Sequence, residues 1–283
     1  MNDLEVRQLR YFVAVAEELH FGRAATRLGM AQPPLSRAIR EIERFLGVRL
    51  LERTTRNVAL TPAGETLLRD ARHALDAVGA AGRRARNAGL PAPVLRLALK
   101  ADFDAGLLPR IVAAYRRDQA ALPVEPLLGG RGEQVPALHD GRADVALLPT
   151  PFDERGLDHE PLMTEPNLVA LATTDPLAAL PSLSLADFRG RKLPDGAEAS
   201  LGPQRPHRGP SRLDMTQIFN LIEIGTLVFF VPASVARRYT RPDIVYRDVT
   251  DLPPAGLAVA WPQDCRSPAV AAFVRTALAV AAA

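Results

Sequence analysis

The apolar positions of the N-terminal third recur with helical periodicity and predict three short helices. The first helix has apolar residues at i, i+3, i+4 and i+7: Leu9, Phe12, Val13 and Ala16. A second helix begins near Phe21 and ends before Gly29, which stands where a C-cap glycine is expected. Pro33 and Pro34 suit the first turn of a third helix, where missing N–H groups cost little. The apolar positions of this third helix are Leu35, Ile39, Ile42 and Leu46.

A three-residue turn separates the second and third helices, which is the layout of a helix-turn-helix. In that motif the second helix enters the major groove and presents its N-terminal side chains to base edges. The residues beside the apolar stripe are Gln32, Pro33, Ser36, Arg37 and Arg40. Glutamine and arginine carry the paired polar groups that base edges require, and serine reaches a base or a phosphate. A plain three-helix bundle with a solvated polar face has the same periodicity, so the pattern alone leaves both interpretations open.

Residues 48–61 contain two β-prone segments around a polar turn, which predicts a hairpin or wing. Arg53 and Arg56 lie at this turn. Arginines at the tip of a wing suit the narrow, electronegative minor groove. The alternative is that both are solvated turn charges. Residues 1–60 are therefore predicted to form an all-α winged helix-turn-helix domain.

Residues 61–88 are predicted to form one long helix, because Thr61 and Pro62 supply an N-cap followed by a proline in the first turn. Small and apolar residues then repeat with spacings of four and three, at Leu67, Ala71, Ala74, Val78, Ala81 and Ala85. This is the a/d seam of a coiled coil, and it favours a homodimer through this helix. A surface helix packed on its own domain is the alternative. Residues 89–93 contain glycine and two prolines and predict a hinge.

From residue 94 to 283, strand-like runs alternate with helical patterns, which is typical of an α/β domain. Strands are expected at 94–99, 124–128 and 143–148, with a helix in each interval. This order predicts a parallel sheet with ligands near the carboxyl ends of its strands. The proline-rich segment 203–212 is expected to form a surface loop.

Length and charge add to this picture. A chain of 283 residues is long enough for two or three packed units. Residues 1–90 hold 15 arginines against 10 acidic residues, which suggests that this end meets a polyanion. The single cysteine, Cys265, excludes an internal disulfide and fits a reducing compartment. Neither a signal-peptide pattern nor a membrane-length apolar run is apparent, so we expect a cytoplasmic protein without membrane association.

The segment from Leu9 to Gly64 resembles the N-terminal domain of LysR-type transcription regulators. The matching pieces are FGRAA at 21–25, QPPLSR at 32–37, IREIE at 39–43, LGVRLLER at 46–53 and LTPAG at 60–64. The resemblance implies a dimerising linker helix, frequent tetramers and a wing that uses Arg53. It also implies DNA contacts from the recognition helix through Gln32, Pro33, Ser36, Arg37 and Arg40. Ala31 and His20 depart from the family, which usually has serine at both positions. Loss of a serine cap at position 31 would cost about 1 kcal/mol.

The remainder resembles the LysR-type effector domain, which is similar to periplasmic binding proteins: two α/β lobes with a cleft between them. The matching pieces are LLP at 107–109, LHDGRAD at 138–144 and FVP at 230–232. Lobe I is expected at about 94–164 and 232–283, and lobe II at about 165–231. The crossing segments are expected near 165–169 and 227–231.

The resemblance places the effector against the loops that follow the strands. The expected contacts are Lys100, Ala101, Asp102, Phe103, Gly129, Gly130, Pro149 and Thr150. Lys100 would attract an anionic effector and Asp102 would repel it, so an effector with an amine or with both charges is one interpretation. The other is that Asp102 or Asp104 caps the next helix and Lys100 is solvated.

These patterns predict a sequence-specific DNA-binding regulator, with double-stranded DNA and a small-molecule effector as partners. The alternatives are a cytoplasmic enzyme or a solute-binding protein with an appended helical domain. Against an enzyme, the five histidines are scattered, and no phosphate-binding glycine loop, metal-ligand cluster or nucleophile signature is apparent. We therefore expect no catalytic residue, cofactor or metal. The absence of a signal peptide disfavours the solute-binding protein.

Overall fold

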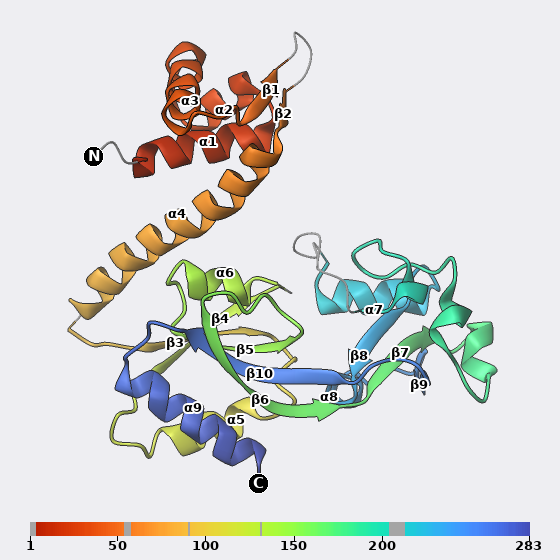
Figure 1. Ribbon diagram of the computed structural model, residues 1–283. Coiled ribbons are helices and arrows are strands. Elements are labelled where there is room, and N and C mark those ends of the chain that lie inside the picture. The colour runs from red at the N-terminus through yellow and green to blue at the C-terminus, as the bar shows by residue number, and fades with distance from the viewer. Residues whose placement is uncertain (1–3, 54–57, 90, 131, 204–212) are drawn as a thin grey trace. The chain divides into compact units, whose positions relative to one another are not determined.

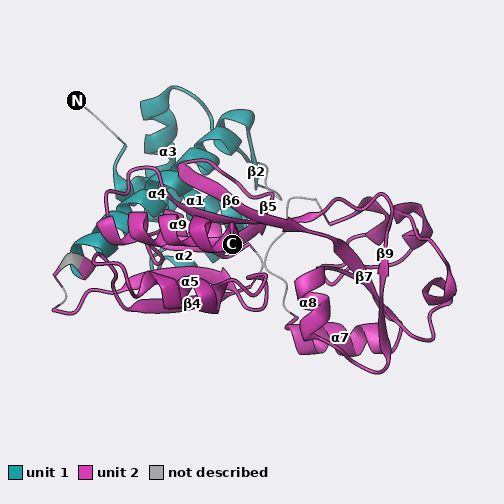
Figure 2. Ribbon diagram, turned by 90° about the horizontal axis from the view of Figure 1, so that it is seen from below, with its two compact units in different colours: residues 1–86 teal, residues 87–283 magenta. Residues whose placement is uncertain are grey.

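The computed structural model describes residues 4–53, 58–89, 91–130, 132–203 and 213–283. The chain divides into two compact units, residues 1–86 and 87–283 (Figure 2). Each unit contains its own cluster of buried apolar side chains. Among the described residues, no helix combines the length and the apolar character that a membrane span requires.

In its described residues, the first unit consists of four helices and a two-stranded hairpin (Figure 1). Its elements are α1 (Val6–Glu18), α2 (Phe21–Arg27), α3 (Gln32–Leu46), β1 (Leu51–Arg53), β2 (Val58–Leu60) and α4 (Pro62–Ala88). The three predicted short helices, the hairpin and the long linker helix are all present. The tip of the hairpin, which includes Arg56, lies outside the described residues.

The core of the first unit forms where the apolar stripes of α1 and α3 meet α2. Its buried residues include Phe12, Val15, Ala24, Ala25, Leu35, Ile39 and Ile42. The two alanines of α2 lack long side chains, so α1 and α3 can approach this helix closely. Three elements are also joined by one carboxylate, because Glu17 of α1 accepts hydrogen bonds from Arg27 of α2 at 2.8 Å and Arg72 of α4 at 2.7 Å.

The start of α4 is fixed by a threonine and a glycine. Thr61 Oγ1 accepts a hydrogen bond from the Gly64 N–H at 3.0 Å and donates one to the Arg49 carbonyl at 2.7 Å. A Cβ atom at position 64 would lie 2.1 Å from the Leu50 carbonyl oxygen. Only glycine therefore allows the helix to approach the chain before β1 this closely.

Lobe I of the second unit is built on a five-stranded sheet of order β4-β3-β5-β10-β6. The strands are β3 (Leu95–Lys100), β4 (Val124–Gly129), β5 (Val145–Thr150), β6 (Leu157–Glu165) and β10 (Ala255–Pro262). As predicted, β3 pairs in parallel with β4 and β5, whereas β10 runs antiparallel to β5 and β6. Helices α5 (Leu108–Tyr115) and α9 (Pro268–Ala281) cover one face, and α6 (Gln134–His139) covers the other (Figure 1).

Lobe II is built on a three-stranded antiparallel sheet of order β8-β7-β9. Its strands are β7 (Asn167–Ala172), β8 (Phe229–Pro232) and β9 (Ile244–Asp248). Its helices are α7 (Met215–Glu223), α8 (Ala233–Arg238) and the short 3-10 turns η1 (Pro176–Ala179), η2 (Leu185–Phe188) and η3 (Ala199–Leu201). Most of the expected loop 203–212 lies outside the described residues.

The chain crosses between the lobes at two places, and only the first was predicted correctly. It enters lobe II at Pro166, between β6 and β7, within the expected segment 165–169. The return was expected at 227–231 but occurs between Asp248 and Ala255, because β7 pairs with both β8 and β9. The expected lobe boundary at residue 232 is therefore wrong, and α8 and β9 belong to lobe II.

Candidate DNA-binding and effector-binding sites

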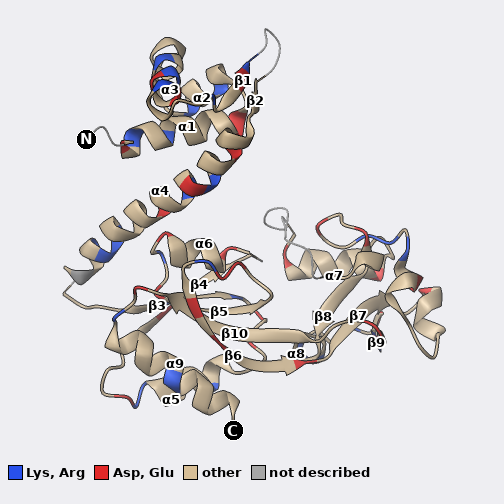
Figure 3. Ribbon diagram, in the orientation of Figure 1, with Lys and Arg blue, Asp and Glu red and all other residues tan. Residues whose placement is uncertain are grey.

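Helix α3 presents the residues that are expected to contact DNA on its outer face. Gln32, Pro33, Arg37 and Arg40 are exposed, and Ser36 is half-buried. On the opposite face Leu35, Ile39 and Ile42 are fully buried in the core. Basic residues recur along this helix (Figure 3). The apolar face of the helix thus packs on the core, and its polar side chains are available to a partner.

The start of α3 needs no side-chain cap. Ala31 is the N-cap residue, and its side chain makes no capping hydrogen bond. A serine at this position would normally accept a hydrogen bond from the N–H of the second or third helical residue. These residues are Pro33 and Pro34, which have no N–H to donate. The expected cost of about 1 kcal/mol for the missing serine therefore does not arise.

His20 performs the capping that the missing serine would perform at α2. It is the N-cap residue, and its Nδ1 accepts a hydrogen bond from the Arg23 N–H at 3.2 Å. Helices α2 and α3 therefore both begin without the serine that is usual in the family.

Arg53 is anchored within the unit and is not a solvated turn charge. Its guanidinium lies 2.8 Å from a carboxylate oxygen of Glu43 and 4.9 Å from the centre of the Phe21 ring. The other oxygen of Glu43 accepts the N–H groups of Leu50 and Leu51 at 3.0 and 3.2 Å. Arg53 therefore ties the end of β1 to α3 and α2.

The predicted seam of α4 divides into two parts. Leu67 packs partly buried against the core of the first unit, and Ala71 is buried. The remaining seam positions are exposed: Ala74, Val78, Ala81 and Ala85. This last part of the seam is available to a partner.

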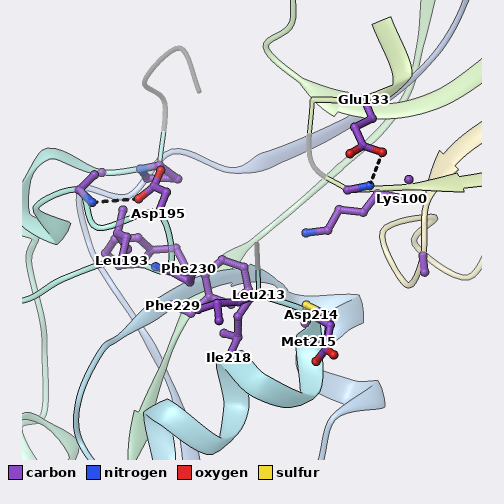
Figure 4. A pocket seen from close by; sticks show the side chains of 17 residues that line it. Lys100, Glu133, Leu193, Asp195, Leu213, Asp214, Met215, Ile218, Phe229 and Phe230 are labelled. Atoms are coloured by element: carbon purple, nitrogen blue, oxygen red, sulfur yellow. Dashed lines mark hydrogen bonds between the residues drawn. The ribbon is translucent and has the colours of Figure 1, made fainter. Parts of the chain in front are cut away.

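A pocket of about 390 Å³ lies between the two lobes of the second unit (Figure 4). Four of the expected effector contacts line it, at the carboxyl ends of β3 and β4: Lys100, Ala101, Gly129 and Gly130. Glu133, which was not predicted, lines it on the same side. Lobe II contributes mainly apolar side chains, including Leu193, Leu213, Met215, Ile218, Phe229 and Phe230. The volume falls within the range of small-ligand sites.

A smaller cavity of about 70 Å³ lies beside the crossing segments. Phe103, Pro149 and Thr150 line this cavity, which Lys100 also reaches. Gly256 on β10 leaves room for Thr150, since a Cβ there would lie 2.1 Å from the threonine Oγ1. Pro149 and Thr150 thus lie at the predicted strand end but not in the larger pocket.

Asp102 departs from the expectation, because it lines neither cavity. Its carboxylate accepts hydrogen bonds from the Tyr239 hydroxyl at 2.5 Å and from Arg238 at 3.2 Å, both in lobe II. Burial, followed by this hydrogen bond to Asp102, raises the pKa of Tyr239 to about 12. The buried Asp104 lies 2.9 Å from the same arginine and accepts the Leu108 N–H, which supports the start of α5.

The other end of α8 is also held by lobe I. Glu165, at the end of β6, accepts hydrogen bonds from the Ser234 N–H at 2.7 Å and the Ser234 hydroxyl at 2.6 Å. Helix α8 is therefore fastened by Glu165 at its start and by Asp102 and Asp104 at its end. No local pattern in the sequence predicts these contacts, because the partners lie 69 to 137 positions apart.

Among the described residues, no group of His, Cys, Asp and Glu side chains is placed to hold a metal ion. An exposed recognition helix and a pocket between two α/β lobes define a DNA-binding regulator that responds to a small molecule. Residues 6–65 match the bacterial regulatory helix-turn-helix protein, lysR family, and residues 88–282 match the LysR substrate binding domain. The chain belongs to the LysR family of transcription regulators.

Relatives extend over almost the whole chain. The transcriptional regulator AlsR of Bacillus subtilis is 31% identical over 286 residues, which cover 96% of this chain and 94% of AlsR. IlvR of Caulobacter vibrioides is 32% identical over 289 residues, 96% of this chain and 97% of IlvR.

Solved structures of the LysR family regulator CbnR have the same architecture. One superimposes with a TM-score of 0.59 at 27% identity, covering 98% of this chain and 99% of CbnR. Full-length CbnR complexed with its target DNA superimposes with a TM-score of 0.56 at 27% identity, covering 98% and 100%.

Proposed function

We propose that α3 reads duplex DNA in the major groove through Gln32, Pro33, Ser36, Arg37 and Arg40. The observation that carries this proposal is the exposure of these side chains on a helix whose opposite face is buried. Glutamine and arginine at the start of such a helix suit base edges. CbnR, which has the same architecture, has been crystallised with its target DNA.

The wing would serve the same DNA in two ways. Arg53 positions the hairpin through Glu43 and Phe21 and contributes positive charge beside the recognition helix. Arg56 remains a predicted contact with the minor groove.

DNA binding is tested by fluorescence anisotropy with a labelled duplex taken from the DNA that flanks the gene for this chain. Binding should weaken steeply with salt, because each neutralised phosphate releases counterions. Arg37→Ala should lower affinity about tenfold, whereas Arg142→Ala, which removes the same charge from the second unit, should change it less than twofold. Salt-independent binding, or equal effects of the two variants, would refute the proposal.

The second unit would act by binding and not by catalysis. We infer that a small molecule occupies the pocket between the lobes and favours one arrangement of the chain over another. That change would alter how two DNA-binding units sit on two half-sites. In a thermal-shift screen of metabolites, a ligand that stabilises the protein should be recovered chemically unchanged by mass spectrometry.

The assembly would be a homodimer through the exposed part of the α4 seam, with pairs of dimers forming tetramers. Its small seam residues allow close helix packing, although alanine buries little apolar area. A regulator that binds chromosomal DNA would work in the cytoplasm.

A further inference from the structure

The two lobes contribute different chemistry to the larger pocket. Lobe I supplies Lys100, Glu133 and the backbone around two glycines, whereas the wall from lobe II is mainly apolar. The apolar wall consists mainly of Leu193, Leu213, Met215, Ile218, Phe229 and Phe230. A ligand that fills the pocket would therefore place a polar head against lobe I and an apolar body against lobe II.

Lobe I presents charges of both signs to that head. Lys100 ends β3 opposite Gly129 on the neighbouring strand, and Glu133 follows shortly after β4. Figure 4 shows the amine of Lys100 reaching into the pocket below the carboxylate of Glu133. This carboxylate also accepts the Gly130 N–H at 3.1 Å, which fixes its position.

The surroundings of Lys100 are aromatic. Its ammonium lies 3.5 Å from the centre of the Phe103 ring and 5.9 Å from that of Phe229. Such cation–π contacts orient the ammonium beside the two rings. A ligand carboxylate that reaches Lys100 would also lie beside these rings.

A head with a single charge suits this site poorly. An anion would pair with Lys100 but be repelled by Glu133. A cation would pair with Glu133 but be repelled by Lys100. On the lobe II side, Asp195 and Asp214 also line the pocket, although each carboxylate already accepts a backbone N–H, from Ala197 and Gln217 respectively. These two acidic side chains further disfavour a purely anionic ligand.

We propose that the effector is an α-amino acid with a large apolar side chain. Its carboxylate pairs with Lys100, its ammonium pairs with Glu133, and its side chain packs on Phe229, Met215 and Ile218. This assignment rests on the proposed effector site and specifies what the site selects.

Two matched sets of compounds test the assignment by isothermal titration calorimetry on the full chain. The first set is L-phenylalanine, 3-phenylpropanoate and 2-phenylethylamine, and the second is L-leucine, 4-methylpentanoate and 3-methylbutylamine. Within a set the apolar body is constant and only the charged head changes. In at least one set the amino acid should bind at least tenfold more tightly than either partner compound.

Substitutions of Glu133 and Lys100 test which side chain binds each charge of the ligand. Glu133→Gln should reduce the advantage of the amino acid over the carboxylate to less than threefold, whereas Lys100→Met should weaken the amino acid at least tenfold. Glu125→Gln, on β4 but outside the pocket, should leave every affinity unchanged. Circular dichroism checks that each variant is folded.

Equal binding of the carboxylate and the amino acid would overturn the assignment in favour of an anionic effector. An advantage of the amino acid that survives in Glu133→Gln would overturn the assignment of Glu133, because another group would then bind the ammonium. Failure of all six compounds to bind would also overturn it. The same protein sample is assayed for DNA binding, so that salt-dependent binding to the duplex preserves the proposed regulator even when the amino acid assignment fails.

Discussion

Single side chains decide how the elements of the DNA-binding unit meet. Glu17 gathers arginines from α2 and α4, and Glu43 joins Arg53 to the backbone before β1. Gly64 removes the side chain that would collide with the Leu50 carbonyl. The last of these residues lies in a motif visible in the sequence, but the reason for the glycine is visible only in the structure.

Gly64→Ala should destabilise the first unit by more than about 2 kcal/mol, because the added Cβ would overlap a backbone oxygen that cannot move freely. Gly82→Ala, on the same helix, is the matched control. Its Cβ would meet only the end of Arg86 at 4.0 Å, so it should stabilise the helix by up to about 1 kcal/mol. Urea unfolding followed by circular dichroism measures both. Equal effects would contradict the close approach.

Glu17→Gln should lower stability at pH 7 by about 1 kcal/mol, as expected for a partly exposed ion-pair network. Burial raises the pKa of Glu17, but hydrogen bonds from Arg72 and Arg27 outweigh it and hold that pKa below its ordinary value. The carboxylate therefore stabilises the fold above about pH 4.3, and this contribution is lost as the pH falls through the lowered pKa.

Unfolding curves of the wild type and Glu17→Gln, recorded between pH 7 and pH 3, check this sign. The gap between the two proteins should narrow in acid. A gap that stays constant or widens would show that the ionised carboxylate is not the stabilising group.

At the scale of elements, the sequence predicted local features well and distant pairings poorly. The helices of the first unit and the parallel strands β3, β4 and β5 follow from apolar periodicity. Strand β6 was missed, because it includes Pro161 and few apolar residues. Strand β9 was missed because it is short and pairs with β7, about 75 positions earlier in the chain.

The contacts that hold α8 against lobe I are an example of such distant pairing. Asp102 was expected to face the effector, because it follows β3 directly. Instead its carboxylate accepts hydrogen bonds from Arg238 and Tyr239. Its backbone is in the left-handed region, with φ of 67°. Lys100 lines the pocket two positions earlier, so one short loop joins the pocket to the contact between the lobes. No periodic pattern in the sequence could have indicated this partner.

Helix capping gives a test at the same scale. Ala31→Ser should change stability by less than about 0.3 kcal/mol, because the two prolines that follow Gln32 leave no N–H for the serine hydroxyl. Thr61→Ala should cost about 1 kcal/mol, because it removes the hydrogen bond from the Gly64 N–H. Thermal unfolding of the two variants provides the comparison. Stabilisation by Ala31→Ser near 1 kcal/mol would contradict this account of α3.

For the whole molecule, the exposed α4 seam predicts the assembly. Val78→Glu places a charge in the centre of the seam and should convert dimers to monomers at micromolar concentration, because the buried glutamate would lack a partner. Arg69→Glu changes an exposed residue nine positions before Val78, which lies on the opposite face of the same helix, and should leave the dimer intact. Analytical ultracentrifugation distinguishes the two results. Dimers that persist in Val78→Glu would place the interface elsewhere.

The central claim is that α3 recognises base edges, and the most direct test is the affinity of Gln32→Ala for two duplexes, the operator and a scrambled sequence of equal length. Loss of a bidentate base contact should lower operator affinity about tenfold, within the 1–3 kcal/mol expected for such a contact. Affinity for the scrambled duplex should stay within twofold of the wild type, because phosphate contacts are retained. Unchanged operator affinity, or an equal loss on both duplexes, would contradict recognition through this helix.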